Sequence, residues 1–126
     1  MRVLIVDDLA AVREALRLLL NDEPGVEVIG EARDGEEAVQ LVEALRPDLV
    51  LMDIEMPRLG GLAAMRLIRR QPNPPRLVAM SIYGASDSLR ANALEAGALS
   101  YVEKGATLAE VVGALRAAFM SPPPDP

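Results

Sequence analysis

The 126-residue sequence contains no cysteine and no histidine. The lack of cysteine excludes disulfide bonds and thiolate metal sites. The lack of histidine excludes a histidine general base, a histidine metal ligand and a phosphohistidine carrier. Any chemistry that this chain performs therefore has to come from other side chains, such as carboxylates, hydroxyls and amines.

Aromatic and basic residues are also few. The aromatic residues are Tyr83, Tyr101 and Phe119, which argues against a stacking platform for single-stranded nucleic acid. The formal net charge is -6 and the longest basic run is Arg69-Arg70, so we expect no direct binding of nucleic acid. Among the 13 basic residues Lys104 is the only lysine, which singles out its position.

Long apolar runs are absent too. None approaches the length of about 20 residues that a membrane helix needs, and no signal-peptide pattern opens the chain. We therefore expect a cytoplasmic protein without membrane contact. The length fits one domain, which we place at residues 1–120, and we interpret the proline-rich residues 121–126 as a tail or the start of a linker.

Strand-like and helix-like segments alternate five times along the chain. Apolar runs predict strands at residues 2–6, 26–32, 49–52, 77–80 and 100–103. Amphipathic patterns predict helices at residues 9–20, 35–45, 62–70, 86–96 and 108–119. This order predicts a parallel sheet with helices on both faces. Segment 26–32 alternates in polarity and fits an edge strand.

Polar side chains follow all five predicted strands. The second strand is followed only by Arg33-Asp34, which fits its place at an edge, and the other four strands end in residues that suit a shared site. Asp7 and Asp8 follow the first strand, Asp53 the third, Ser81 the fourth and Lys104 the fifth. Parallel strands all end at the same edge of a sheet, and ligand sites form there, where the strand order reverses. We therefore expect these five residues to converge.

Three carboxylates, a hydroxyl and an ammonium suit phosphoryl chemistry. Carboxylates bind a hard cation such as Mg²⁺, and a carboxylate beside a metal and a lysine is a nucleophile toward phosphorus. Metal, ammonium and hydroxyl then hold the phosphoryl oxygens. Taken singly, each residue has a simpler interpretation: Asp8 as a helix cap, Ser81 as a turn residue and Lys104 as a solvated strand end.

The same residues match a known family. The chain resembles the receiver domain of two-component response regulators over residues 2–119. The matching motifs are Val6-Asp7-Asp8, Met52-Asp53-Ile54-Glu55-Met56-Pro57 through Gly61, Met80-Ser81, and Tyr101-Val102-Glu103-Lys104. The runs Ser81-Ile82-Tyr83 and Glu103-Lys104-Gly105-Ala106-Thr107 resemble the branch that precedes a helix-turn-helix DNA-binding domain. The resemblance implies an α/β, flavodoxin-like, doubly wound sheet of five parallel strands in the order 2-1-3-4-5, with five helices.

The resemblance assigns a role to each position of the site. Asp53 is expected to accept a phosphoryl group from the phosphohistidine of a sensor histidine kinase. Mg²⁺ (or Mn²⁺) is expected to bind Asp8, Asp53 and the backbone carbonyl of Glu55, with Asp7 acting directly or through water. The side chain of Glu55 is expected to face the incoming donor. Lys104 is expected to pair with Asp53 or with the new phosphoryl group.

Two further residues are expected to report the switch. Ser81 would move to a phosphoryl oxygen, and the rotamer of Tyr101 would follow. The simpler interpretation of Tyr101 is a half-buried strand residue with a satisfied hydroxyl. The changed surface would then control a transcriptional output domain or form a homodimer. The alternatives are a stand-alone receiver, a metal-dependent phosphatase with an aspartate nucleophile, and a pseudo-receiver without phosphotransfer.

Four residues depart from the pattern usual in the family. Ile82 stands where many relatives have a small residue and is expected to narrow access to the phosphoryl site. Glu103 replaces an apolar residue, and its carboxylate is expected to compete for Lys104. Gly105 replaces a common proline, and Gly60 a polar residue. We expect these changes to affect rates and not the type of reaction.

Overall fold

The computed structural model describes residues 1–56, 59–81 and 87–122. Within these ranges strands and helices alternate in the order β1 Arg2–Val6, α1 Ala10–Asn21, β2 Glu27–Ala32, α2 Gly35–Leu45, β3 Leu49–Asp53, α3 Gly61–Arg69, β4 Arg76–Ser81, α4 Asp87–Ala96, β5 Ala98–Glu103 and α5 Leu108–Met120. The predicted alternation is confirmed. The largest shift is at β5, which begins two residues before its predicted start because Ala98 still pairs with Leu77 of β4.

The strands form one sheet in the order β2-β1-β3-β4-β5, and every neighbouring pair is parallel. The predicted flavodoxin-like topology is therefore confirmed. β2 is the partly exposed edge strand that its alternating sequence predicted. The strand order reverses between β1 and β3, so the crevice where such sheets bind ligands lies at the ends of these two strands.

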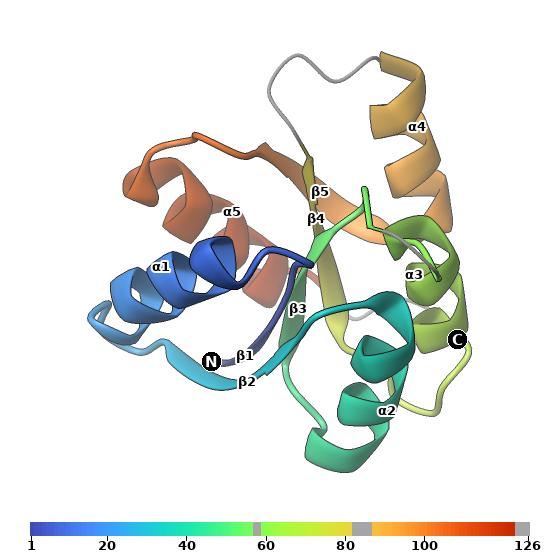
Figure 1. Cartoon of the computed structure of the whole chain (residues 1–126), viewed down its shortest axis with the longest axis horizontal. Helices are drawn as coiled ribbons and strands as arrows, with labels where there is room; N and C mark the ends of the chain where they lie inside the picture. The colour runs from blue at the N-terminus through green and yellow to red at the C-terminus, as the bar shows by residue number, and fades with distance from the viewer. Residues whose placement is uncertain (57–58, 82–86, 123–126) are drawn as a thin grey trace.

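The sheet has a helical layer on each face (Figure 1). Side chains of successive strand residues point to opposite faces. In β3, Val50 and Met52 therefore pack with α2, α3 and α4, whereas Leu49 and Leu51 pack with α1 and α5. All five residues of β3 are buried. This two-sided burial explains why its sequence is an uninterrupted apolar run.

Local caps fix the ends of three of the helices. Thr107 caps α5 through a complete capping box with Glu110, as the sequence predicted. The N-cap of α2 is Asp34, whose carboxylate accepts the N–H of Glu37 at 2.8 Å. Gly97 ends α4 with φ of 118°, a conformation that favours glycine. The capping box at Thr107 thus fixes the start of α5 a few residues after Lys104, at the carboxyl edge of the sheet.

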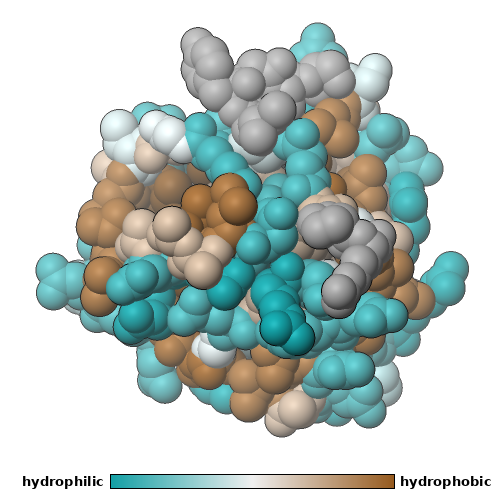
Figure 2. All heavy atoms as spheres, viewed as in Figure 1, coloured by the Kyte–Doolittle hydropathy of each residue, from teal (hydrophilic) through white to brown (hydrophobic). Residues whose placement is uncertain are grey.

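Apolar side chains gather over α1 and α5 on the face drawn in Figure 2. Leu9, Leu18 and Leu19 are each about half exposed, at 53%, 58% and 48%.

No helix of the described residues has the length and apolar character that a membrane crossing requires.

Candidate phosphoryl-acceptor and metal site

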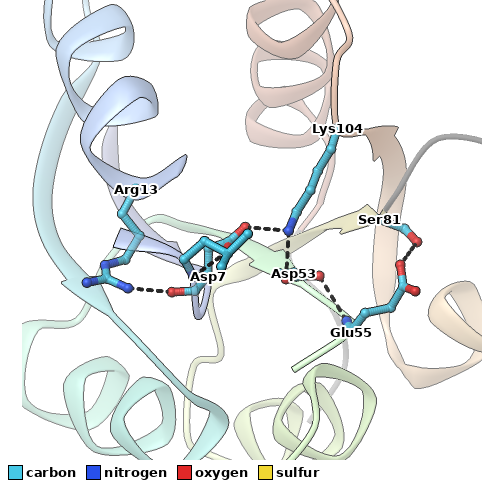
Figure 3. Close-up of polar contacts among 7 residues, drawn as sticks. Asp7, Arg13, Asp53, Glu55, Ser81 and Lys104 are labelled. Carbon is cyan, nitrogen blue, oxygen red and sulfur yellow. Dashed lines mark hydrogen bonds and ion pairs between the residues drawn. The ribbon is translucent and has the colours of Figure 1, made fainter. Parts of the chain in front are cut away.

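The residues predicted to converge lie at one edge of the sheet. Asp7 follows β1, Asp53 is the last residue of β3, Ser81 is the last residue of β4, and Lys104 follows β5. Figure 3 shows these side chains approaching one another from different strands. Asp7, Asp53 and Ser81 are fully buried, each at 0% exposure. Charged groups are rarely buried without a compensating partner.

Lys104 supplies that partner. Its Nζ lies 3.0 Å from Asp7 Oδ2 and 3.0 Å from Asp53 Oδ2, and its side chain is 20% exposed. The interpretation of Lys104 as a solvated strand end is therefore wrong. A lysine meets this geometry because its ammonium is a compact point charge with three donors.

The second oxygen of each buried aspartate accepts a backbone N–H from two residues further along the chain. Asp7 Oδ1 accepts from Leu9 at 2.9 Å, and Asp53 Oδ1 accepts from Glu55 at 2.9 Å. Both are Asx turns, which aspartate favours where a strand ends. Each carboxylate is thus held on one side by its own loop and on the other by Lys104.

Burial raises the pKa of the Asp53 carboxyl above its ordinary value of 3.8. The Glu55 N–H and Lys104 lower this pKa again in part, whereas the charge of Asp7 adds to the rise. For Lys104, burial lowers the pKa, but the hydrogen bond to Asp53 and the ion pair with Asp7 outweigh burial and raise the pKa above 10.5. Lys104 is therefore a permanent cation at neutral pH.

Asp8 adds a third carboxylate at the open side of the site. Oxygens of Asp7, Asp8 and Asp53 all lie within 4.8 Å of one another, and Asp8 is exposed. Within the described part of the chain, the buried Asp7 Oδ2 accepts no hydrogen bond of good geometry. The simpler interpretation of Asp8 as a helix cap is wrong, because Leu9 and not Asp8 is the N-cap of α1, and its side chain makes no capping hydrogen bond. Oxygen ligands at this spacing fit a hard cation such as Mg²⁺.

Arg13 supports this cluster and was missed by sequence reasoning. Its Nη1 donates to the backbone carbonyl of Asp7 at 2.8 Å, and its Nε lies 3.3 Å from Glu31 Oε1. Figure 3 shows the bond between Arg13 and Asp7. Through its two contacts Arg13 ties the loop after β1 to β2. The only signal in the sequence is one of two arginines in an amphipathic helix, which does not reveal the contact.

The side chains of Ser81 and Glu55 form a contact that the sequence did not predict. Ser81 is buried in β4 and donates its hydroxyl hydrogen bond to the carboxylate of Glu55. The Glu55 side chain is exposed and contacts Ser81 of β4, and its contact with an incoming donor stays a prediction. Ser81 is also no ordinary turn residue.

Tyr101 and Glu103 of β5 both contact Arg90 of α4. The Arg90 guanidinium lies 4.9 Å from the centre of the Tyr101 ring and 4.0 Å from Glu103. Tyr101 is half-buried, and its hydroxyl has no hydrogen-bond partner in the part of the chain that the structure describes. The expected competition of Glu103 for Lys104 is wrong, since Glu103 leans toward α4 and Lys104 toward Asp53.

The other departures have local explanations or lie elsewhere. Gly105 has φ of 95°, which the ring of a proline forbids. Gly60 is the N-cap of α3 and has no side chain with which to cap it. Ile82 and Pro57 lie outside the described residues.

Replacing Asp8 by asparagine tests the metal site. Without metal, the variant is expected to melt roughly 2–4 °C above wild type, because one of three like charges is removed. In wild type, Mg²⁺ at a hundred times its dissociation constant should stabilise the fold by about 2.7 kcal/mol, and the variant should lose most of this gain. Thermal melts with and without Mg²⁺ measure both effects.

The matched control is Glu43→Gln, which neutralises an exposed carboxylate of α2. It should melt like wild type and keep the gain from Mg²⁺. An equal response of both variants to Mg²⁺ would contradict the acidic site.

Comparison with known proteins agrees with the geometry. Residues 3–116 match the response regulator receiver domain family. The transcriptional regulatory protein LiaR of Bacillus subtilis (strain 168) is 40% identical over 122 residues, which are 97% of this chain and 57% of LiaR. A protein-glutamate methylesterase/protein-glutamine glutaminase of Pyrococcus horikoshii is 45% identical over 105 residues, 82% of this chain and 28% of that enzyme. The chain therefore spans less than two thirds of either relative.

A solved structure shares the fold. A chain of the CheX–CheY–BeF3–Mg²⁺ complex from Borrelia burgdorferi superposes with a TM-score of 0.87 at 29% identity, over 96% of this chain and 90% of that one. The likeness to LiaR agrees with the expected branch of transcriptional regulators. With the family match over residues 3–116, the chain belongs to the response regulator receiver domains of two-component systems.

Proposed function

We propose that Asp53 accepts a phosphoryl group from the phosphohistidine of a sensor histidine kinase and that this modification switches the domain between two states. The observation that carries the proposal is the ion pairing of Lys104 with two buried carboxylates at the carboxyl edge of the sheet. An ammonium held there can pair with the Asp53 carboxylate before the reaction and with a phosphoryl oxygen after it.

The reaction forms a bond between an oxygen of Asp53 and phosphorus, while the bond between phosphorus and the donor's imidazole nitrogen breaks. The imidazole keeps the electron pair and takes up a proton. Charge on the phosphoryl oxygens then has to be neutralised. Lys104 does so by transferring its hydrogen bond from Asp53 to a phosphoryl oxygen, and Ser81 contributes one hydroxyl donor.

Mg²⁺ (or Mn²⁺) held by Asp7, Asp8 and Asp53, with the backbone carbonyl of Glu55, would supply the remaining positive charge. The three carboxylates within 4.8 Å of one another support this ligand set. The CheX–CheY complex, a chain of which shares this fold, was solved with BeF3 and Mg²⁺. The role of Tyr101 as the reporting aromatic belongs to the same proposal and is supported by its partial burial beside Arg90.

The surface around α1 and α5 is the proposed partner face. An apolar groove of ≈ 310 Å³ opens there between α1 and the loop after β5, lined by Ala15, Leu19, Ala106 and Val111 and bordered by Lys104. A kinase or a second copy of the chain that docks on this groove would reach the acceptor site. Phosphorylation would then favour a homodimer.

The output is proposed to be transcriptional. The name of LiaR as a transcriptional regulatory protein supports this output, whereas the match to a methylesterase supports an enzyme as another possible context for such a receiver. The net charge of -6 supports a receiver that does not itself bind nucleic acid. A cytoplasmic location belongs to the same proposal, with residues 121–126 as a tail or the start of a linker.

Incubation with Mg²⁺ and acetyl phosphate tests the acceptor. Wild type should gain the mass of one phosphoryl group, and Asp53→Asn should gain none because its amide is no nucleophile. Intact-mass spectrometry measures both. Asp22→Asn removes an exposed carboxylate at the end of α1 and should be modified like wild type.

The alternatives predict other outcomes. A pseudo-receiver would keep its mass with several phosphodonors. A phosphatase would turn over a free phosphomonoester, and Asp53→Asn would abolish that turnover.

A further inference from the structure

The hydroxyl of Ser81 is already engaged in the unphosphorylated protein. It donates to the carboxylate of Glu55, which lies in the loop between β3 and α3. In Figure 3 the two side chains point toward one another and not toward Asp53. The serine is fully buried, whereas Glu55 is exposed. A loop residue therefore holds the buried hydroxyl that the phosphoryl group needs.

The backbone around Ser81 is fixed on both sides. The Ile54 N–H donates to the Met80 carbonyl at 2.9 Å, and the Lys104 N–H donates to the Ser81 carbonyl at 2.6 Å. These bonds continue the pairing of β4 with β3 and with β5 up to the end of the strand. The hydroxyl can therefore change partner by rotation about its Cα–Cβ bond, without any change in the sheet.

A serine hydroxyl has one hydrogen to donate. It can serve the carboxylate of Glu55 or a phosphoryl oxygen on Asp53, but not both. Glu55 also donates its backbone N–H to Asp53 Oδ1 at 2.9 Å, so one residue contacts both the acceptor and the hydroxyl. Its carboxylate is thus tied to the acceptor through its own backbone.

We propose that Glu55 is a positioning residue, which holds Ser81 in the inactive arrangement and sets how readily the phosphorylated state forms. This inference rests on the proposed function and adds to it a second hydrogen-bond acceptor, the Glu55 carboxylate, which competes with the phosphoryl group for the Ser81 hydroxyl. The bond to Glu55 has to break before Ser81 reaches the phosphoryl group, so a stronger acceptor at position 55 favours the inactive state.

The test compares Glu55→Ala with Glu55→Gln. Both remove the charge, but only glutamine keeps an oxygen that can accept from Ser81. The readout is the affinity for beryllofluoride, a stable phosphoryl analogue, in saturating Mg²⁺ by ¹⁹F NMR. We expect Glu55→Ala to bind it about five-fold more tightly than Glu55→Gln, the equivalent of one ordinary hydrogen bond.

The control compares the same two Glu55 variants in a Ser81→Ala background, which removes the hydroxyl through which Glu55 is proposed to act. There the two variants should bind beryllofluoride equally. The proposal would be overturned if Glu55→Ala still bound beryllofluoride five-fold more tightly than Glu55→Gln in the Ser81→Ala background. Equal affinities of the two variants in the presence of Ser81 would overturn it as well. If wild type itself takes up neither beryllofluoride nor a phosphoryl group, the proposed function fails first, and the role of Glu55 fails with it.

A second readout needs neither metal nor phosphate. Three-bond NMR couplings of Ser81 in the metal-free protein report its side-chain rotamer. One rotamer is expected in wild type and Glu55→Gln, and averaging in Glu55→Ala. Since Glu55 is exposed, all variants should remain folded. A single rotamer in Glu55→Ala would contradict the inference.

Discussion

Replacing Lys104 by methionine is expected to destabilise the metal-free protein by roughly 3 kcal/mol, since it leaves two buried carboxylates without their cation. Asp7 and Asp53 are fully buried, and Lys104 Nζ lies 3.0 Å from each. The value is at the low end for a broken buried pair because the lysine side chain is 20% exposed. Methionine keeps most of the apolar stem, so lost packing contributes little. Urea unfolding in EDTA measures the effect.

Mg²⁺ should stabilise Lys104→Met more than wild type, because the cation replaces the missing charge. The loss of stability in Lys104→Met relative to wild type should also become smaller as the pH is lowered. Without Lys104 the pKa of Asp53 rises further, so its carboxyl takes up a proton in the folded state before it does in the unfolded chain, and stability is regained as the pH falls toward 3.8.

The double variant Lys104→Met, Asp53→Asn is the control for this prediction. It removes one of the two unpaired charges and should recover part of the lost stability, which gives a coupling energy for the pair. An unfolding free energy of Lys104→Met equal to that of wild type in EDTA would mean that the bridge contributes nothing.

Periodicity allowed the parallel α/β sheet to be predicted, whereas its strand order was implied by the family resemblance. The alternation of five apolar runs with five amphipathic segments corresponds to the observed sheet, and the exposed pattern of residues 26–32 corresponds to the edge strand β2. The convergence of Asp7, Asp8 and Asp53 follows from topology alone, because parallel strands end together. These features depend on backbone direction, which hydrophobic patterning encodes.

Side-chain partners could not be predicted in the same way. Sequence reasoning paired Lys104 with Asp53 but did not expect the equal contact to Asp7. It also left Ser81 free, whereas the structure places its hydroxyl on Glu55. These contacts depend on rotamers and on loop turns that bring together residues distant in sequence. No periodic pattern records them.

Gly61→Ala should destabilise the protein by about 3 kcal/mol or slightly less, near the top of the usual range for overpacking. Gly61 is the first residue of α3. A Cβ there would lie 2.3 Å from the Asp53 carbonyl oxygen and 2.4 Å from Ile54 Cα. Both are backbone atoms at the end of β3, so no side-chain rotation relieves the clash. Chemical denaturation measures the loss, and the rate of acyl-phosphate formation should fall as well because Asp53 moves with its backbone.

Gly113→Ala provides the matched control for this substitution. Gly113 lies on the exposed side of α5, and a Cβ there meets no atom within 4 Å. Alanine in a helix interior is more favourable than glycine by about 0.5–1 kcal/mol, so this variant should be more stable than wild type and be phosphorylated at the same rate. If Gly61→Ala lowers the free energy of unfolding and Gly113→Ala raises it, the loss at position 61 comes from steric contact with β3 and not from helix propensity. Equal stabilisation of both variants would mean that α3 can shift away from β3 without cost, and that the close approach of Gly61 does not fix the position of Asp53.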